Sequence, residues 1–164
     1  MREPDTSGLE SLDGAAGRPA GELVPHQGAA LLLDRIESAD AGMLTASLTV
    51  RPGTAFSNDD GSLAGWAGPE IMAQAVSAFS TLTSGREGGP AIGLLLGARD
   101  YRSRLNAFPA GTRLEVSVTE STRDQDGGGV FDCCIRLGAE IVADGRLTVF
   151  EPVDPWAILQ AQSG

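Results

Sequence analysis

The single segment that strongly favours a helix lies among strand-like segments, and this arrangement restricts the possible folds more than any other feature. The segment opens with Gly68-Pro69, and proline is well tolerated at the first position of a helix. Large apolar residues then recur at spacings of three and four up to about Thr83, alanines fill most other positions, and Gly85 follows. We therefore predict one helix over about 69–83 that can pack closely against a sheet.

Strand-like segments flank this helix on both sides. Before it, residues 30–36 and 43–50 are joined by a turn at 40–42, which predicts a β-hairpin. After it, strands are expected over 91–101, 112–122, 129–137 and 141–150, with a turn signal at 143–145 inside the last segment. An antiparallel sheet packed on one helix is an α+β architecture, and here we expect the sheet to wrap around the helix.

The length and local composition predict one domain. Residues 1–20 are rich in Gly, Pro, Ser, Asp and Ala and offer little apolar surface to bury, so we expect a flexible tail. The remaining residues, 21–164, suit a single domain with one core.

Charge and motif content exclude several function classes. The formal charge of −10, with no lysine in the chain, would repel nucleic acid. No apolar run is long enough to span a membrane and no signal-peptide pattern is visible, so a cytoplasmic location is expected. No phosphate-binding loop, dinucleotide fingerprint or zinc-ligand spacing is present, so we expect no metal and no redox cofactor.

Several segments, in order along the chain, resemble one family. They are LVPH at 23–26, LLLDRI at 31–36, NDDGSLAGWAGPE at 58–70, EIMAQA at 70–75, LLLGARDY at 94–101 and FPAG at 108–111. Together they resemble the hotdog-fold 3-hydroxyacyl-carrier-protein dehydratases, and the segment 58–70 resembles their aryl-polyene, ApeP-like branch.

This resemblance implies a hotdog fold, in which an antiparallel sheet wraps around one long helix. It implies dehydration of a 3-hydroxyacyl thioester to the trans-2-enoyl thioester, in fatty-acid or polyene synthesis. The substrate would be carried by acyl carrier protein or coenzyme A, and two identical subunits would form each acyl tunnel at their interface. Two alternatives remain open: a hotdog thioesterase, and a non-catalytic acyl-binding or partner subunit.

The chain departs from the resemblance at one catalytic position. The family carries a histidine in the loop before the helix, and here His26 is the only histidine in the chain. Dehydration needs a base for the C2 proton and an acid for the departing hydroxyl. We predict His26 as the base and protonated Glu70, which matches the family's catalytic glutamate, as the acid. Glu70 could instead only favour the helix start, and His26 could be a tunnel-mouth residue.

Further residues are candidates for substrate binding: Asn58, Asp60, Gly65, Trp66 and Gly68. Backbone N–H groups over 65–68 would polarise the thioester carbonyl at the start of the helix. Asn58 and Asp60 could equally serve to build a turn.

A local basic group and a pair of thiols complete the candidates. Arg99, Arg102 and Arg104 could dock an acidic carrier protein, or could protect an edge strand by their charge. Cys133 and Cys134 are adjacent in a strand-like segment, so their side chains should point to opposite faces and stay as thiols.

Overall fold

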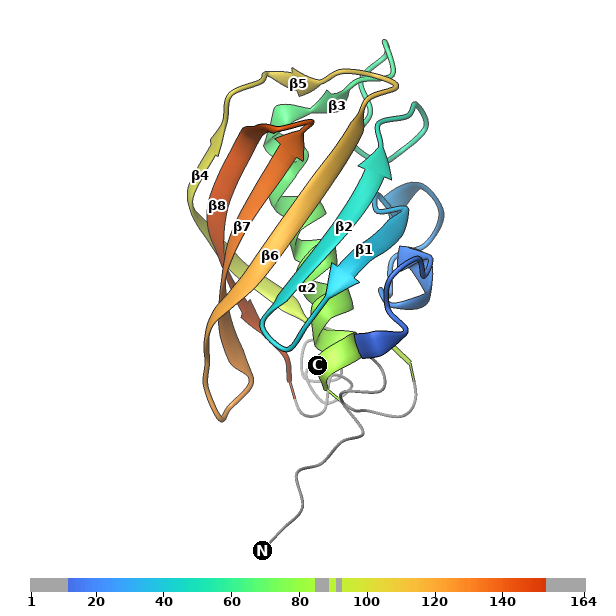
Figure 1. The fold of residues 1–164 in the computed structure, drawn as a ribbon. Helices are drawn as coiled ribbons and strands as arrows, with labels where there is room; N and C mark the ends of the chain where they lie inside the picture. Colours follow the sequence, from blue (N-terminus) through green and yellow to red (C-terminus); the bar gives the residue numbers. More distant parts are fainter. Residues whose placement is uncertain (1–11, 85–88, 91–92, 153–164) are drawn as a thin grey trace, which may run out of the picture.

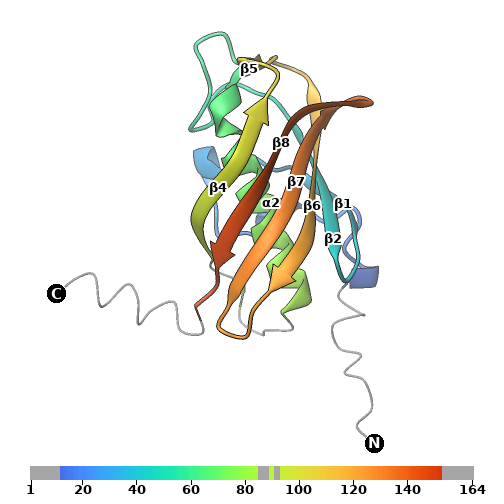
Figure 2. The same ribbon diagram turned by 90° about the vertical axis from the view of Figure 1, so that its left-hand side faces the viewer.

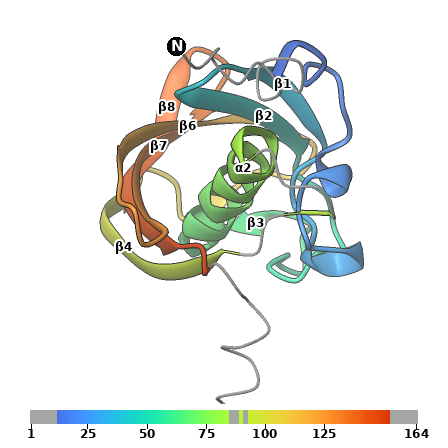
Figure 3. The ribbon, with the colours of Figure 1, turned by 90° about the horizontal axis from the view of Figure 1, so that it is seen from below.

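One helix lies inside a strongly curved antiparallel sheet in the computed structural model, which describes residues 12–84, 89–90 and 93–152 (Figure 1). Helix α2, Gly68–Thr83, begins at the predicted Gly68-Pro69 and ends at the predicted Thr83. Seen from below, the sheet curves around α2 (Figure 3). The predicted α+β class and the sheet wrapped around a helix are confirmed.

The large sheet has six strands in the order β1-β2-β6-β7-β8-β4, all pairs antiparallel. Their bounds are β1 Arg35–Ala39, β2 Met43–Thr49, β4 Leu94–Ser103, β6 Arg113–Arg123, β7 Gly128–Leu137 and β8 Glu140–Phe150. A small second sheet pairs β3, Leu63–Ala64, with β5, Ala107–Phe108. Three 3₁₀ turns are η1 Ala20–Glu22, η2 Gly28–Ala30 and η3 Gly65–Ala67. None of the helices in these described residues is long and apolar enough to cross a membrane.

The core lies between α2 and the concave face of the large sheet. The apolar helix residues Ile71, Met72 and Phe79 are buried, and Phe79 meets Phe131 of β7 edge to face at 5.7 Å. The predicted alanine faces are also buried at Ala75 and Ala78. These small side chains let the helix lie close to the curved sheet, which fixes the position of its first turn.

Residues 12–20 are docked against β1, which corrects the expectation of a flexible tail over 1–20. Ala15 and Ala20 are fully buried. Edge strands leave backbone groups unpaired, and this segment satisfies them on β1, a contact that local composition cannot reveal. Residues 1–11 of the expected tail lie outside the described residues. The backbone hydrogen bonds run from Gly17 N to Ile36 O (2.8 Å), from Ile36 N to Arg18 O (2.9 Å) and from Ala20 N to Asp34 O (3.0 Å).

The turn predicted at 143–145 is absent, because β8 continues through it. Gly145 pairs with Cys133 on β7, and a Cβ added to it would lie 3.2 Å from Tyr101 Cα on β4. Beside this contact β4 has a bulge, in which Asp100 has a φ of 54°. Gly145 therefore serves the close approach of two strands, not a chain reversal.

The opposite edge of the sheet, β4, is open. None of the residues of this strand, which lies at the edge of the sheet in Figure 2, is buried, and Leu94, Leu95 and Leu96 are 41%, 42% and 63% exposed. Three adjacent exposed leucines on an edge strand form an apolar surface that a single subunit leaves uncovered.

Candidate active site

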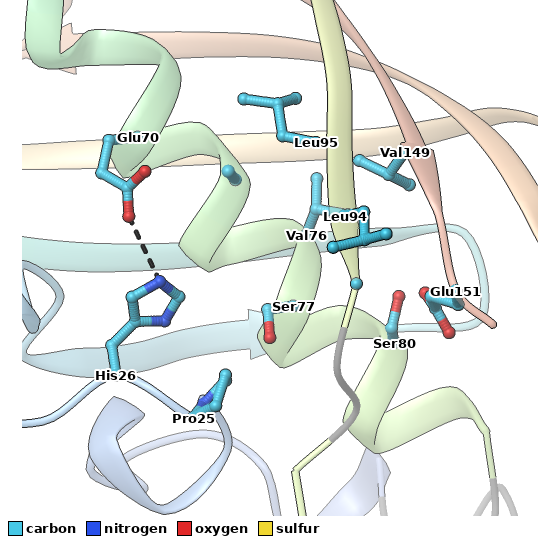
Figure 4. A pocket seen from close by; sticks show the side chains of 12 residues that line it. Pro25, His26, Glu70, Val76, Ser77, Ser80, Leu94, Leu95, Val149 and Glu151 are labelled. Atoms are coloured by element: carbon cyan, nitrogen blue, oxygen red, sulfur yellow. Dashed lines mark ion pairs between the residues drawn. The ribbon is translucent and has the colours of Figure 1, made fainter. Parts of the chain in front are cut away.

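The two predicted catalytic side chains lie together. His26 precedes η2, Glu70 lies in the first turn of α2, and His26 Nε2 is 3.2 Å from Glu70 Oε1 (Figure 4). Both are partly exposed, with 29% and 30% of their side-chain surfaces accessible. Their catalytic role stays a prediction, but the distance lets a proton pass directly between them.

Gln74 holds this arrangement in place from one helical turn below Glu70. Its side chain is fully buried, and Nε2 donates to Glu70 Oε1 (3.1 Å) and to Ala30 O (2.7 Å). Gln74 Oε1 accepts a hydrogen bond from Leu32 N (2.9 Å). One amide thus joins the Glu70 carboxylate to the chain that follows His26. A polar residue four positions after the predicted acid, on a helix face that should be buried, is the sequence signal for this role.

The loop that carries His26 is also fixed on its other side. Thr81 Oγ1, near the end of α2, donates to Leu23 O at 2.8 Å. Since Gln74 ties down Ala30 and Leu32, both flanks of the His26 loop are anchored to the same helix. The His26 ring therefore takes its position relative to Glu70 from α2.

Glu70 Oε1 faces two nitrogens: Gln74 Nε2 donates to it at 3.1 Å, and His26 Nε2 lies 3.2 Å away. With the His26 proton on Nε2, the remaining nitrogen, Nδ1, is a bare acceptor. Nδ1 is buried and has no hydrogen-bond partner among the described residues. Nε2 is therefore the His26 ring nitrogen that faces the carboxylate.

A pocket of about 230 Å³ begins at this pair and runs beside α2 (Figure 4). Its middle wall is mainly apolar, with side chains from α2, β4 and β8. The lining residues are Pro25, His26, Glu70, Ala73, Val76, Ser77, Ser80, Gly93, Leu94, Leu95, Val149 and Glu151. An elongated apolar pocket that starts at an acid–base pair suits a chain with its reactive end at Glu70.

The backbone at the start of α2 is already engaged, which corrects the expectation of free N–H groups at Gly65 and Gly68. Tyr101 Oη donates to Gly65 O at 2.6 Å, and Gly68 N donates to the same carbonyl. Gly65 N donates to Asn106 O at 2.8 Å. A Cβ on Gly68 would collide with the Tyr101 hydroxyl, so the glycine is needed for this contact. Burial raises the pKa of Tyr101, which keeps its hydroxyl neutral. Sequence reasoning gave Tyr101 no role, and no local pattern indicates it.

Three other candidates lie away from the pocket. Asp60 Oδ1 accepts hydrogen bonds from Ser62 N (2.9 Å) and Ser62 Oγ (2.5 Å), which lower the pKa of Asp60. Asn58 Nδ2 donates to the same Ser62 Oγ (3.0 Å), so both residues build a turn. Trp66 is 70% exposed, packs edge to face on Phe56, and lines a separate shallow hollow.

The three arginines are exposed on and just after β4. Arg102 lies next to Tyr101, which contacts the start of α2, so the group reaches the end of the molecule where the pocket begins. Within the described part of the chain, Arg99, Arg102 and Arg104 make no ion pair. The described part of the chain also contains no cluster of three or more His, Cys, Asp or Glu side chains suited to a metal ion.

Comparisons with known proteins agree on family and fold. The family model for ApeP dehydratase, of the ApeP-like group, matches residues 18–160. A structure described as the dehydratase heterocomplex ApeI:P from Xenorhabdus doucetiae is 27% identical, with a TM-score of 0.80, and the match covers 90% of this chain and 99% of that one. No curated protein sequence matches significantly.

More distant structures share the fold alone. A mutant thioesterase from Pseudomonas aeruginosa is 20% identical, with a TM-score of 0.55 and coverage of 71% of this chain and 78% of that one. The E. coli PaaI protein of the phenylacetic acid degradation operon is 20% identical, with a TM-score of 0.54 and coverage of 71% and 81%. Together with the heterocomplex, they confirm the predicted hotdog fold.

Proposed function

The chain belongs to the ApeP-like dehydratase family, and on this basis we propose that it removes water from a 3-hydroxyacyl thioester bound to acyl carrier protein. The product is the trans-2-enoyl thioester, in fatty-acid or polyene synthesis in the cytoplasm. The contact between His26 and Glu70 at the start of an elongated pocket is the observation that carries the proposal. The fold is shared with thioesterases, but the family match supports dehydration over thioester hydrolysis.

His26 acts as the base in this proposal. Its Nδ1 takes the proton from C2 of the substrate, and the electrons of that C–H bond form the C2–C3 double bond. The ring is then an imidazolium that donates through Nε2 to Glu70 Oε1, 3.2 Å away. The adjacent carboxylate stabilises this charge.

Glu70 acts as the acid. The Nε2 proton passes to Glu70, and protonated Glu70 gives it to the C3 hydroxyl, which departs as water with the electrons of the C–O bond. The proton taken from C2 is thereby balanced by the one delivered to the leaving group. His26 regains its starting tautomer by proton exchange with water. Gln74 keeps the carboxylate beside the ring throughout, because it is bonded to Glu70 and to the chain after His26.

Substitution of the pair tests this assignment. Glu70→Gln and His26→Ala should each lower the dehydration rate by about 10²-fold or more, because each removes one proton-transfer group. The double variant should be little worse than either single variant, since groups acting as a unit are not additive. Thermal melting of each variant controls for folding. Full additivity of the two losses would contradict a coupled pair.

The reaction itself is tested by mass spectrometry of a 3-hydroxyacyl carrier protein incubated with the protein as it assembles. Loss of water supports the dehydratase. Loss of the acyl group would indicate a thioesterase, and an unchanged mass would indicate an acyl-binding subunit.

We further propose that a second hotdog subunit pairs along β4. Leu94 and Leu95 are exposed and also line the pocket, so a neighbour there would complete the pocket wall. The resemblance implies a homodimer, whereas the similar solved structure is a heterocomplex, and the missing loop histidine supports a different second subunit. Sedimentation of the pure chain separates the two: a dimer supports the homodimer, and a monomer that assembles only with a second dehydratase subunit supports the heterocomplex.

Carrier-protein docking is proposed for the three arginines of β4 and its end. They are exposed cations without acidic partners in the described residues, on a chain of net charge −10. Charge reversal at Arg102 and Arg104 should raise KM for a carrier-bound substrate and leave KM for the same acyl pantetheine unchanged. Equal changes for both substrates would contradict docking.

A further inference from the structure

The far end of the pocket is polar and deeply buried. Ser80 lies ten residues along α2 from Glu70, which at the rise of a helix is about 15 Å. Its side chain is 2% exposed, and its Oγ has no hydrogen-bond partner among the described residues. Glu151, which directly follows β8, is 9% exposed and lines the same end of the pocket (Figure 4).

A buried hydroxyl without a partner costs folding free energy, so its presence needs an explanation. Alanine fits the helix well, since Ala73 faces the same pocket and Ala75 and Ala78 are fully buried. Ser80 therefore keeps a polar group at a position where a smaller apolar residue would be more stable. A ligand group that hydrogen-bonds to Ser80 Oγ accounts for it.

The setting of Glu151 indicates the kind of ligand group. Its backbone N donates to Gly127 O at 2.8 Å, which fixes the residue at the end of the sheet. Arg123 Nη1 lies 3.7 Å from Glu151 Oε1, while Arg123 Nε bonds more closely to Glu120, at 2.8 Å. The carboxylate charge is thus partly balanced by Arg123, whose positive charge would repel a cation placed beside Glu151. A neutral hydrogen-bond donor fits better than a charged one.

We propose that Ser80 and Glu151 bind a hydroxyl group at the far end of the acyl chain. The hydroxyl donates to the Glu151 carboxylate and accepts from Ser80 Oγ, so both buried groups gain a partner. Between the two ends the wall is apolar, with Val76, Leu95 and Val149, so the chain between them is a hydrocarbon. This inference rests on the proposed function and names its substrate class: 3-hydroxyacyl thioesters with a terminal hydroxyl.

Binding of non-reacting probes tests the inference apart from catalysis. Dodecanoyl pantetheine and its ω-hydroxy and ω-amino analogues lack the C3 hydroxyl and cannot be dehydrated. We expect the assembled protein to bind the ω-hydroxy probe about tenfold or more tightly than the plain probe in calorimetry, as a hydrogen bond to a charged acceptor would give. Equal affinities, or tightest binding of the ω-amino probe, would overturn the inference.

Two variants and a matched control locate the effect. Ser80→Ala and Glu151→Leu should each reduce the preference for the ω-hydroxyl several-fold, and Ser84→Ala, directly after the same helix and outside the pocket, should not. Ser80→Ala should also leave the melting temperature of the free protein equal or higher, whereas a structural role for the hydroxyl would lower it. A preference that survives in both pocket variants would overturn the assignment.

Dehydration of the corresponding 3-hydroxy substrates is measured in parallel. An ω-hydroxyl preference in binding without any dehydration would contradict the proposed function and support the terminal-hydroxyl site. Dehydration with no ω-hydroxyl preference would support the proposed function and contradict the terminal-hydroxyl site.

Discussion

The two edges of the large sheet are treated in opposite ways. At β1, residues 12–20 pair with the edge strand through backbone hydrogen bonds and bury two alanines against it. At β4, no strand residue is buried and three consecutive leucines are exposed. Unpaired edges invite association, so proteins usually block them. A chain that closes one edge with its own N-terminal segment and leaves the other apolar and open directs association to β4.

Removal of the closing segment should have the largest effect. Deletion of residues 1–20 takes away the two hydrogen bonds to β1 and the one to Asp34 just before it, each worth about 1 kcal/mol, so we expect a loss of about 3 kcal/mol. The melting temperature should then fall by about 6–12 °C in calorimetry. Arg18→Ala removes only an exposed ion pair with Glu22 and should change stability by about 0.5 kcal/mol at most. An unchanged melting temperature after the deletion would show that this N-terminal segment does not stabilise β1.

A substitution at the open edge, β4, should weaken the association of subunits and leave the stability of the fold unchanged. Leu96→Asp replaces the most exposed of the three leucines, so the subunit should melt as before. Loss of one buried leucine at an interface, about 2 kcal/mol, should weaken association roughly 30-fold in sedimentation velocity. Met43→Asp, at an exposed apolar position of β2, is the matched control and should leave association unchanged. Equal association of Leu96→Asp and the natural chain would place the interface elsewhere.

A polar contact at the closed edge gives the smallest expected effect. Glu37 lies on β1 and accepts a hydrogen bond from Ser47 Oγ at 2.6 Å and one from Arg113 Nη2 at 2.8 Å. These contacts lower the pKa of Glu37 below its ordinary 4.5. A lowered carboxyl pKa stabilises the fold above pH 4.5, and this contribution is lost as the pH falls through the folded value.

Glu37→Gln should therefore lower the free energy of unfolding at pH 7, by less than about 1 kcal/mol because the contact is near the surface. Chemical denaturation at several pH values should show the difference between the two proteins shrinking below pH 4.5. A difference that stays constant down to pH 3 would contradict an electrostatic origin.

Local sequence signals predicted most of the fold. The start of α2 follows from Gly68-Pro69, and its end and buried faces follow from the spacing of apolar residues. The strands followed from alternation and turn residues. Local signals failed where a residue is determined by a distant neighbour: Gly145 looks like a turn residue, yet it lies in a strand because Tyr101 packs on it.

The site shows the same contrast between residues that could be predicted from the sequence and residues that are determined by distant contacts. The pairing of His26 with Glu70 was predicted from their chemistry and from the family resemblance, although 44 positions separate them. Gln74, Tyr101, Ser80 and Glu151 have roles that depend on contacts with remote parts of the chain. Asn58 and Asp60 show the converse case, in which polar residues in the loop before α2 stabilise their own turn.

For the acyl substrate proposed above, the course of the pocket along one side of α2 means that positions on this helix set the length of chain that fits. Glu70, Ala73, Ser77 and Ser80 follow one another along that side at spacings of three or four, and each turn adds about 5.4 Å. A larger side chain at Ser77 shortens the usable length by about one turn, and one at Ala73 by about two. Selection for acyl length can therefore change, in evolution or by engineering, one helix position at a time while the sheet stays the same.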